Sequence, residues 1–341
     1  IAFVLLDKIR DPWVQQYDLT LRLHRVTTNA ELALGNYAAG YKLGDELCKH
    51  SKTSIDALPT IISKVTALSN ENKRTQSIEV AIKTTQTMLG VYPKRGIVWT
   101  IIKELVWIKS YFRRHKDKDI LEMPLMTDPK HLFSMRLFSQ IITTAIQNGR
   151  ITEWLVATVK SIRLTIKHGI CEHSALAFTL WGLLSVGLGD SKGATRFANL
   201  ATSILERTNG ESTKGFVYVI CPVAINRWSK SSVFCMNFLH QGYHAAMGCG
   251  DTEAGSICSL TSNIAAYNDG YPVYDVYKAF VGVEDEMKLF NVDSNKYVLL
   301  QCKNGVSMLL GHKAIDWDEF EHFGDTNQSI TESDEVLDEK E

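Results

Sequence analysis

Helix-and-turn patterns recur along this chain, and this recurrence constrains the fold more than any other feature. Two of the four intervals between turns are about 40 residues, one is about twice that, and the last carries about one extra half-unit. Turn-forming residues stand at Gly35-Asn36, 70–73, Gly149, Gly189-Asp190 and Gly250-Asp251. Two helices per unit, at a period of about 34 to 45 residues, are typical of an α-solenoid, in which each helical hairpin buries its apolar side against its neighbours. The spacing therefore predicts an all-α solenoid of stacked helical hairpins.

The segments between these turns have the apolar periodicity of amphipathic helices. In 131–150, apolar residues such as Leu137, Ile141 and Ala145 recur at helical spacing and so mark one buried face. Residues 21–50 are typical of a helical hairpin, with one helix to about residue 34, a tight turn, and a second helix to about residue 50. The whole chain is expected to contain about eight to twelve helices of this kind.

Three segments interrupt the regular pattern. A sub-boundary is expected near 115–130, in the middle of the longest interval between turns. An insertion is expected at about 207–230. This segment contains many β-branched residues and fits either a helix or an irregular loop. Pro59 lies in the apolar helical segment 54–69. Because a proline well inside a helix costs about 3 kcal/mol, we expect the first turn of this helix to lie near Asp56 to Pro59.

Composition excludes several classes of protein. A net charge of −1 over 341 residues gives no overall field that would attract nucleic acid or an anionic membrane, so neither partner is expected. The longest stretch without charged residues or histidine is 174–189, shorter than the ~20 apolar residues of a spanning helix. Seven cysteines, an odd number without a CxxC pair, argue against a disulfide framework and favour a reducing, cytoplasmic setting.

The glycines of 182–205 raise the question of a phosphate site. Gly187, Gly189 and Gly193 precede an expected helix, as in nucleotide-binding loops. However, the chain contains no Gly-Lys dipeptide for a P-loop, and the G-x-G-x-x-x-G spacing follows a helical segment instead of a strand. We therefore expect Gly187 and Gly189 to end one helix, Asp190 or Ser191 to cap the next, and Gly193 to let the two helices pack closely.

Other chemical sites are supported only by scattered residues. His240 and His244, with Cys249 and Cys258 beyond them, allow a zinc site on paper, but their order and spacing are not those of a zinc finger. A second set comprises His168, Cys171 and His173. Acidic runs at 284–286 and 316–319 are typical of solvated surface, and no G-x-S-x-G nucleophile motif occurs. No catalytic, cofactor-binding or metal-binding residue is therefore predicted.

One basic segment, 109–118, interleaves aromatic and basic side chains and resembles a phosphate-binding patch. Asp117 and Asp119 dilute its charge, and nucleic-acid binding normally needs a broader basic face. A solvated loop between helices is the favoured interpretation, and a nucleic-acid adaptor is the alternative.

Sequence motifs along 10–323 resemble a known family: the helical repeat region that follows the AAA-type (STAND-class) ATPase domain in large signalling proteins. The family's proteins also carry protein kinase, histidine kinase or nucleotide cyclase domains. The matching features are Trp13, Tyr17-Asp18-Leu19-Thr20, Ala30-Glu31, Lys52-Thr53, 67–73, Leu89-Gly90-Val91 with Pro93, LEMPLMTDPKHLFSMRLFSQI, HSALAFTLWGLLSVGLGDSKGATRFANLATSILER, HAAMGCGDTEAGSICSLTSNIAAY and LLQCKNGVSMLLGHKAIDW. Pro59 and 283–295 depart from the family's pattern.

The resemblance implies a TPR-like repeat domain over 1–323, followed by an acidic tail or linker at 324–341. It implies a non-catalytic regulatory or protein-interaction module of a larger ATPase-containing protein, which binds a partner protein or a neighbouring domain. ATP and Mg²⁺ are implied only for an ATPase domain upstream of Ile1, where a G-x-x-x-x-G-K-[ST] loop is expected. The alternative is a segment of a kinase, histidine kinase or cyclase polypeptide whose activity lies outside this chain.

Overall fold

The computed structural model describes residues 9–226, 230–290, 292 and 295–311. The chain divides into two compact units, Ile1–Thr261 and Ser262–Glu341, and the division falls within one helix. The acidic segment expected at 324–341 lies outside the described residues. The sub-boundary expected near 115–130 stays a prediction.

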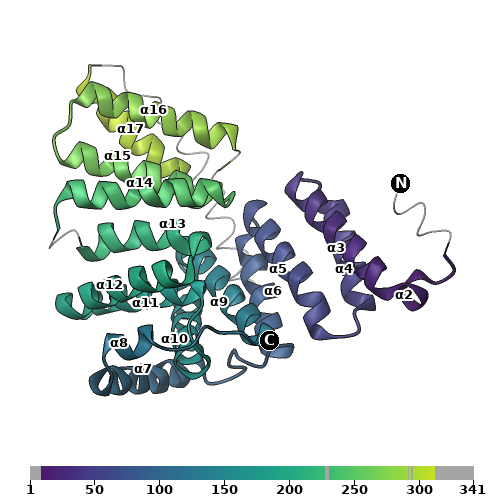
Figure 1. Ribbon diagram of the computed structural model, residues 1–341. Coiled ribbons are helices and arrows are strands. Elements are labelled where there is room, and N and C mark those ends of the chain that lie inside the picture. The colour runs from purple at the N-terminus through teal and green to yellow at the C-terminus, as the bar shows by residue number, and fades with distance from the viewer. Residues whose placement is uncertain (1–8, 227–229, 291, 293–294, 312–341) are drawn as a thin grey trace, which may run out of the picture. The chain divides into compact units, whose positions relative to one another are not determined.

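The described residues form helices joined mostly by short connections, as Figure 1 shows. The α-helices are α2 (Pro12–Gln15), α3 (Tyr17–Ala33), α4 (Tyr37–His50), α5 (Ser54–Asn70), α6 (Arg74–Thr87), α7 (Ile97–Arg114), α8 (Asp117–Leu121), α9 (Pro129–Gln147), α10 (Ile151–His168), α11 (Glu172–Gly187), α12 (Ser191–Thr208), α13 (Glu211–Ile220), α14 (Ser232–Gly248), α15 (Thr252–Asn268), α16 (Val273–Leu289) and α17 (Lys296–Leu309). The predicted number of eight to twelve is wrong, because sixteen are present in the described residues. Helices such as α2 and α8 are about one turn long, which is too short to show an apolar periodicity in the sequence. Packing against the rest of the fold stabilises such short helices.

The predicted turns join consecutive helices and confirm the all-α solenoid class of stacked helical hairpins. Within the first unit, α3 packs on α4, α5 on α6, α9 on α10, and α11 on α12. One residue in each predicted turn has a positive φ, as a reversal between two helices requires: Gly35, Asn72, Gly149, Gly189 and Gly250. The expected hairpin of 21–50 is confirmed, with its turn at 34–36.

Pro59 lies deeper in its helix than the sequence predicted. Thr53 and Asp56 form a capping box, in which each side chain accepts a hydrogen bond from the other residue's backbone N–H. The cap fixes the helix start at Ser54, so Pro59 sits in the second turn of α5 and not in the first. The expectation was wrong because the cap outweighs the preference of proline for the first turn.

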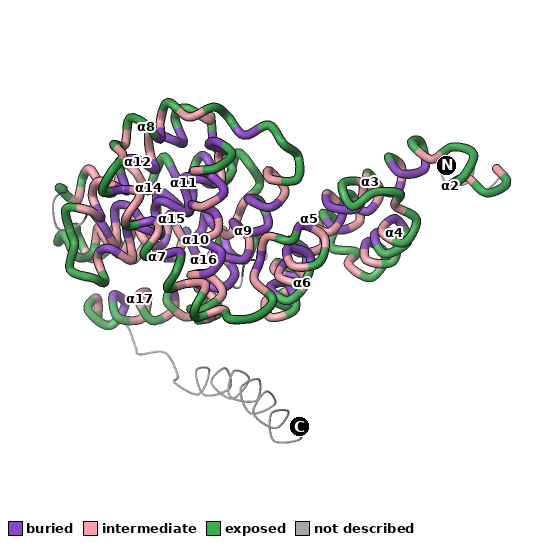
Figure 2. The backbone as a smooth tube through the Cα atoms, turned by 90° about the horizontal axis from the view of Figure 1, so that it is seen from below, coloured by how far each residue is buried: buried purple, intermediate pink, exposed green. Residues whose placement is uncertain are grey.

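The apolar core of the first unit runs from α5 through the helices up to residue 225. Phe138 of α9 and Phe178 of α11 are fully buried in it. Figure 2 shows buried residues on the facing sides of these helices and exposed residues on their outer sides. A separate small core of Trp13, Leu21 and Leu47 lies in the N-terminal hairpin.

The expected insertion is helical over most of its length. It contains α13 and a one-turn π-helix, η1 (Cys221–Ile225), in which Pro222 occupies a first-turn position. Because η1 continues α13 without a break, Pro222 lies within one continuous helical segment, and its missing N–H coincides with the local change from α- to π-helical hydrogen bonding. Residues 227–229 of the insertion lie outside the described residues.

The second unit contains the packed pair α16 and α17. Glu284 of α16 pairs with Lys288 on its own helix (2.8 Å) and with Lys303 of α17 (2.5 Å). The acidic run at 284–286 therefore includes a carboxylate that joins two helices, in addition to solvated surface. Among the described residues, no helix combines the length and apolarity needed to cross a bilayer.

Candidate functional site

The first unit encloses a cavity of about 430 Å³ that is shared by helices far apart in the sequence. Its lining comes from the end of α5, the C-terminal two thirds of α9, the first turns of α11 and α13, and the start of α15 with the turn before it. Cavities of several hundred Å³ lined by a few convergent polar groups are the usual form of a ligand site. This cavity is therefore the candidate functional site.

Arg136 of α9 supplies an uncompensated positive charge to the cavity. It lines the cavity and is exposed within it, and no ion pair or hydrogen bond engages its guanidinium among the described residues. A guanidinium presents five N–H donors in a rigid fork that fits carboxylates and other planar acceptors. Arg136 can therefore donate to a ligand without giving up a contact in the fold.

His173 is the second residue of α11 and is held neutral by its surroundings. Its side chain is only 12% exposed, and its buried Nδ1 has no hydrogen-bond partner. Burial lowers the pKa of His173 to about 4, with a small opposing effect from Glu172 and a further lowering from Arg136. His173 thus brings a buried ring nitrogen without a hydrogen-bond partner to the lining of the cavity, a feature that native structures rarely leave unexplained.

Two glutamines of α9 add further unsatisfied groups. Gln140 donates to Thr66 through Nε2, but its buried Oε1 lacks a partner, and so does the buried Nε2 of Gln147. Unsatisfied buried polar atoms are costly in native proteins. Two lining residues of the cavity therefore hold a buried acceptor, Gln140 Oε1, and a buried donor, Gln147 Nε2, that the fold leaves without a partner.

Acidic side chains at the helix starts complete the lining. Asp251 accepts a hydrogen bond from the backbone N–H of Ala254 (3.0 Å), and burial raises the pKa of this carboxyl group. Glu253 pairs with Arg74 at 3.4 Å and so joins α15 to α6 across 179 positions of sequence. Glu172 lies 3.5 Å from His173, which is uncharged at neutral pH. The lining carries both signs, and a ligand with alternating donors and acceptors complements it best.

A second hollow, of about 350 Å³, surrounds a charged cluster between α7 and α10. The Glu104 side chain is 9% exposed and pairs with Lys160 (3.0 Å) and Arg163 (3.4 Å). Arg163 also lies over the Trp107 ring, 3.7 Å from its centre. These contacts tie the two helices together, which is a structural role.

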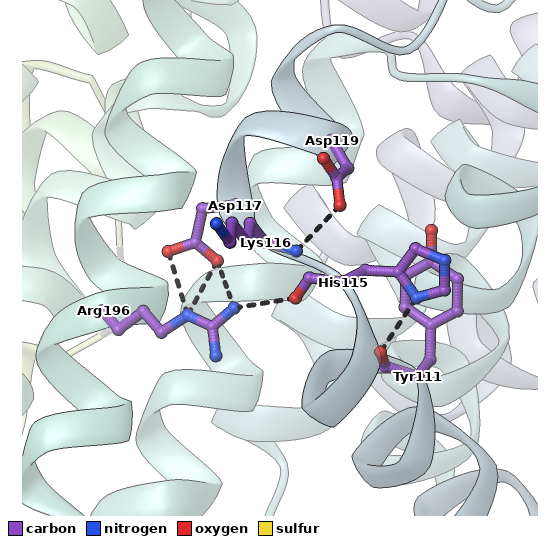
Figure 3. A network of polar contacts seen from close by, with 6 residues as sticks. All are labelled: Tyr111, His115, Lys116, Asp117, Asp119 and Arg196. Atoms are coloured by element: carbon purple, nitrogen blue, oxygen red, sulfur yellow. Dashed lines mark hydrogen bonds and ion pairs between the residues drawn. The ribbon is translucent and has the colours of Figure 1, made fainter.

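The basic segment 109–118 is mostly helix and not the expected loop. Residues 109–114 form the end of α7, and only His115 and Lys116 separate it from α8. Figure 3 shows Asp117 bound to Arg196 of α12, with Nε donating at 2.7 and 2.9 Å. The backbone N–H of Lys116 donates to Asp119 (2.9 Å). The acidic residues that dilute the patch thus fix α8 in place.

The glycine segment 182–205 forms a turn between packed helices. Asp190 accepts from the backbone N–H of Gly193 (2.8 Å) and caps α12, which places a carboxylate where a bound phosphate would lie. The expected role of Gly193 is corrected, because the atoms nearest to an added Cβ would be those of the Asp190 carboxylate, at 2.1 Å. Gly182 is the residue that allows close packing, since its Cβ would lie 3.1 Å from the Ala194 carbonyl oxygen of α12.

The side chains of the two possible metal-binding sets lie apart from one another or already contact other groups. His240 and His244 contact each other through their Nε2 atoms (3.0 Å), whereas Cys258 donates to the Gly215 carbonyl and burial raises its thiol pKa to about 12. In the other set, His168 stacks on His131 while His173 lines the cavity. No three His, Cys, Asp or Glu side chains in the described part of the chain are grouped closely enough to hold a metal ion.

Sequence reasoning named His173 and Asp251 but missed the cavity that brings them together. Arg136, Gln140 and Gln147 lie on a helix whose buried face was recognised, and their own spacing follows the same helical period. A polar row of this kind beside an apolar face looks like ordinary solvated surface in a single sequence. Only the positions of α11, α13 and α15 reveal that this row faces a cavity.

No protein-family model matches the chain, and no curated protein matches it. Among solved structures, it is similar to a Pyrococcus horikoshii protein described as a Signal Transduction ATPase with Numerous Domains (STAND) protein with a tetratricopeptide repeat sensor. The match has a TM-score of 0.39 and 11% identity, and it covers 99% of this chain and 52% of that one. The chain thus spans about half the length of the protein it matches, and its helical-repeat class rests on its own packed hairpins.

Proposed function

We propose that this chain is a non-catalytic helical repeat module that binds a polypeptide segment in its inner cavity. The segment comes from a partner protein or from a neighbouring domain of a larger ATPase-containing signalling protein. The observation that carries the proposal is the unengaged, exposed guanidinium of Arg136 in the cavity lining. Three further lining residues, His173, Gln140 and Gln147, each hold a buried polar atom without a hydrogen-bond partner. A peptide backbone, with one donor and one acceptor at most residues, complements such a set.

Regulation follows from the way in which the cavity is built. Its lining connects residues 65 to 253, and the Arg74–Glu253 ion pair bridges its distant parts. A segment that contacts α9 together with the first turns of α11, α13 and α15 stabilises one arrangement of these helices over others. Through this population shift, binding would be transmitted to a domain packed against the array.

The binding part is tested with peptides of about 12 residues selected from a random library on the immobilised chain. We expect selected peptides to slow hydrogen exchange in the first turns of α11, α13 and α15. Arg136→Gln should weaken their binding about tenfold. Arg207→Gln is the matched control, since Arg207 is an exposed arginine of α12 outside the cavity. The proposal would be contradicted by peptides that bind Arg136→Gln as well as the wild type and that slow hydrogen exchange in other helices.

The regulatory part is tested on the parent polypeptide. We expect its ATP hydrolysis to change when the array is deleted, and to respond to a selected peptide only when Arg136 is intact. Identical ATPase rates with and without the array would remove regulation from the proposal while leaving peptide binding in place.

A further inference from the structure

Helix α7 is apolar on two opposite faces, although only one of them is buried. Ile108 and Phe112 are buried on its inner side. The outer face of α7, which we define as Val98, Trp99, Ile102 and Val106, is 46–69% exposed. Val98, Ile102 and Val106 follow one another at four-residue spacing and so form a single ridge along the helix. Single exposed apolar residues are common on protein surfaces, whereas a contiguous apolar ridge is typical of an interaction surface.

The second half of the same outer side is basic. Lys109 and Arg113 continue the face toward the C-terminal end of α7, and Lys103 lies beside the ridge between Ile102 and Val106. No acidic side chain pairs with these three among the described residues. The nearby acidic residues are already engaged, since Asp117 binds Arg196 and Asp119 caps α8, as Figure 3 shows. The outer face therefore presents an apolar ridge followed by uncompensated positive charge.

The hairpin that begins with α7 is incomplete compared with its neighbours in the first unit. Helices α9 and α11 are each followed by a packed helix of similar length, α10 and α12. In contrast, α7 is followed by α8, which has only five residues, and then by an irregular connection up to Pro129. A single-turn helix cannot cover the length of α7, so part of α7's apolar surface stays open to a helix from elsewhere.

We propose that the outer face of α7 binds an acidic amphipathic helix of a partner protein. Leucine-like side chains of that helix pack on the ridge, and its Asp and Glu residues face Lys103, Lys109 and Arg113. The ridge from Val98 to Val106 is about 12 Å long, which matches the footprint of one helix crossing another. A helix that binds a lipid surface usually presents a longer apolar side with basic residues along its length.

The probe is a fluorescein-labelled synthetic peptide of about 18 residues with Leu at i, i+3, i+4 and i+7, Glu beside them and Ala elsewhere. A matched peptide carries Lys in place of every Glu. Binding to the full 341-residue chain is followed by fluorescence anisotropy. The protein variants are Val106→Glu, the pair Lys109→Glu with Arg113→Glu, and Val26→Glu as control. Val26 of α3 is 67% exposed, compared with 64% for Val106.

The acidic peptide should bind the wild-type chain, and binding should weaken about tenfold with Val106→Glu but not with Val26→Glu. The double charge reversal should abolish binding of the acidic peptide and create binding of the Lys peptide, since the electrostatic part of recognition is exchanged. Each variant should keep the helical circular dichroism and melting temperature of the wild type, because the substituted side chains are exposed. Arg136→Gln should leave this binding unchanged, which separates the outer face from the cavity.

Several results would overturn the proposal. The acidic peptide could fail to bind at concentrations up to about 1 mM, or bind no better than the Lys peptide. Val26→Glu could weaken binding as much as Val106→Glu does. Vesicles of anionic phospholipid could bind through the outer face while the peptide does not, which would assign this face to a membrane surface. Sedimentation could instead show self-association that Val106→Glu abolishes, which would assign it to a second copy of the chain.

Discussion

The inner cavity and the outer face of α7 depart from ordinary surface and core in opposite ways. The cavity places polar atoms such as His173 Nδ1 and Gln147 Nε2 out of contact with any partner. The outer face instead places Trp99, 69% exposed, and Val106 in contact with solvent. Both arrangements are unfavourable for the folded chain taken alone. The two regions thus differ in what the fold leaves unsatisfied, buried polar atoms in one and exposed apolar side chains in the other, and each difference supports one of the two binding proposals.

The largest expected effect separates the two faces of α7. Phe112, 8% exposed, packs edge-on against Phe178 and Phe197 with ring centres 5.9 and 4.9 Å away. Phe112→Ala should lower the free energy of unfolding by about 3 to 5 kcal/mol, whereas Val106→Ala should change it by less than about 0.5 kcal/mol. Urea unfolding measures both values. Similar losses for the two variants would show that the outer face is part of the core.

The next effect concerns pH and the cavity. In the folded state burial lowers the pKa of His173 from 6.5 to about 4, so the unfolded chain binds this proton more readily between these two values. Stability present above pH 6.5 should therefore be lost as the pH falls toward 4, by up to about 3 kcal/mol from this group. Unfolding of the wild type and of His173→Gln at pH 7 and pH 4 isolates the contribution. An equal loss of unfolding free energy in both proteins would show that the His173 imidazole contacts solvent in the folded state.

A turn outside both regions provides a reference for purely local effects. Gly189 has φ +79° and open space around it, so Gly189→Ala should cost about 1 kcal/mol through backbone strain alone. Gly187, at the end of α11, also has open space but a helical backbone, and Gly187→Ala should be neutral or slightly stabilising. Thermal unfolding of the pair gives the difference. If both variants behaved alike, the left-handed conformation at residue 189 would be wrong.

The smallest expected effect is the stability change on removal of the unengaged arginine. Arg136→Gln should alter the free energy of unfolding by less than about 0.5 kcal/mol, because no contact in the fold depends on the guanidinium. Chemical denaturation is the measurement, with Glu104→Gln as the contrasting variant. Glu104 holds Lys160 and Arg163, so its replacement should cost clearly more. A large loss with Arg136→Gln would make Arg136 a structural residue.

Local signals in the sequence predicted the hairpins well. Gly35, Gly149 and Gly189 were assigned to turns, and each turn is present with a positive φ. The cap at Asp190 was also expected. Capping and turn geometry involve residues within about four positions of each other, so both can be predicted from a short stretch of sequence.

Predictions that involved contacts between helices were less successful. Gly193 was assigned to helix packing, but its neighbour is the Asp190 cap, and Gly182 makes the close approach. The basic segment was read as a loop, although helix α7 continues through most of it. For Gly182 the deciding partner, Ala194, lies on another helix.

The amino-acid sequence by itself determined the all-α class and the places where helices stop and start, because propensity, capping and apolar periodicity are properties of short segments. The tertiary structure alone decided which polar side chains share a cavity and which apolar face of α7 stays open. Residues 65 to 253 contribute to the cavity. Their convergence depends on the packing of whole helices, and no local pattern encodes the distance between side chains so far apart along the chain.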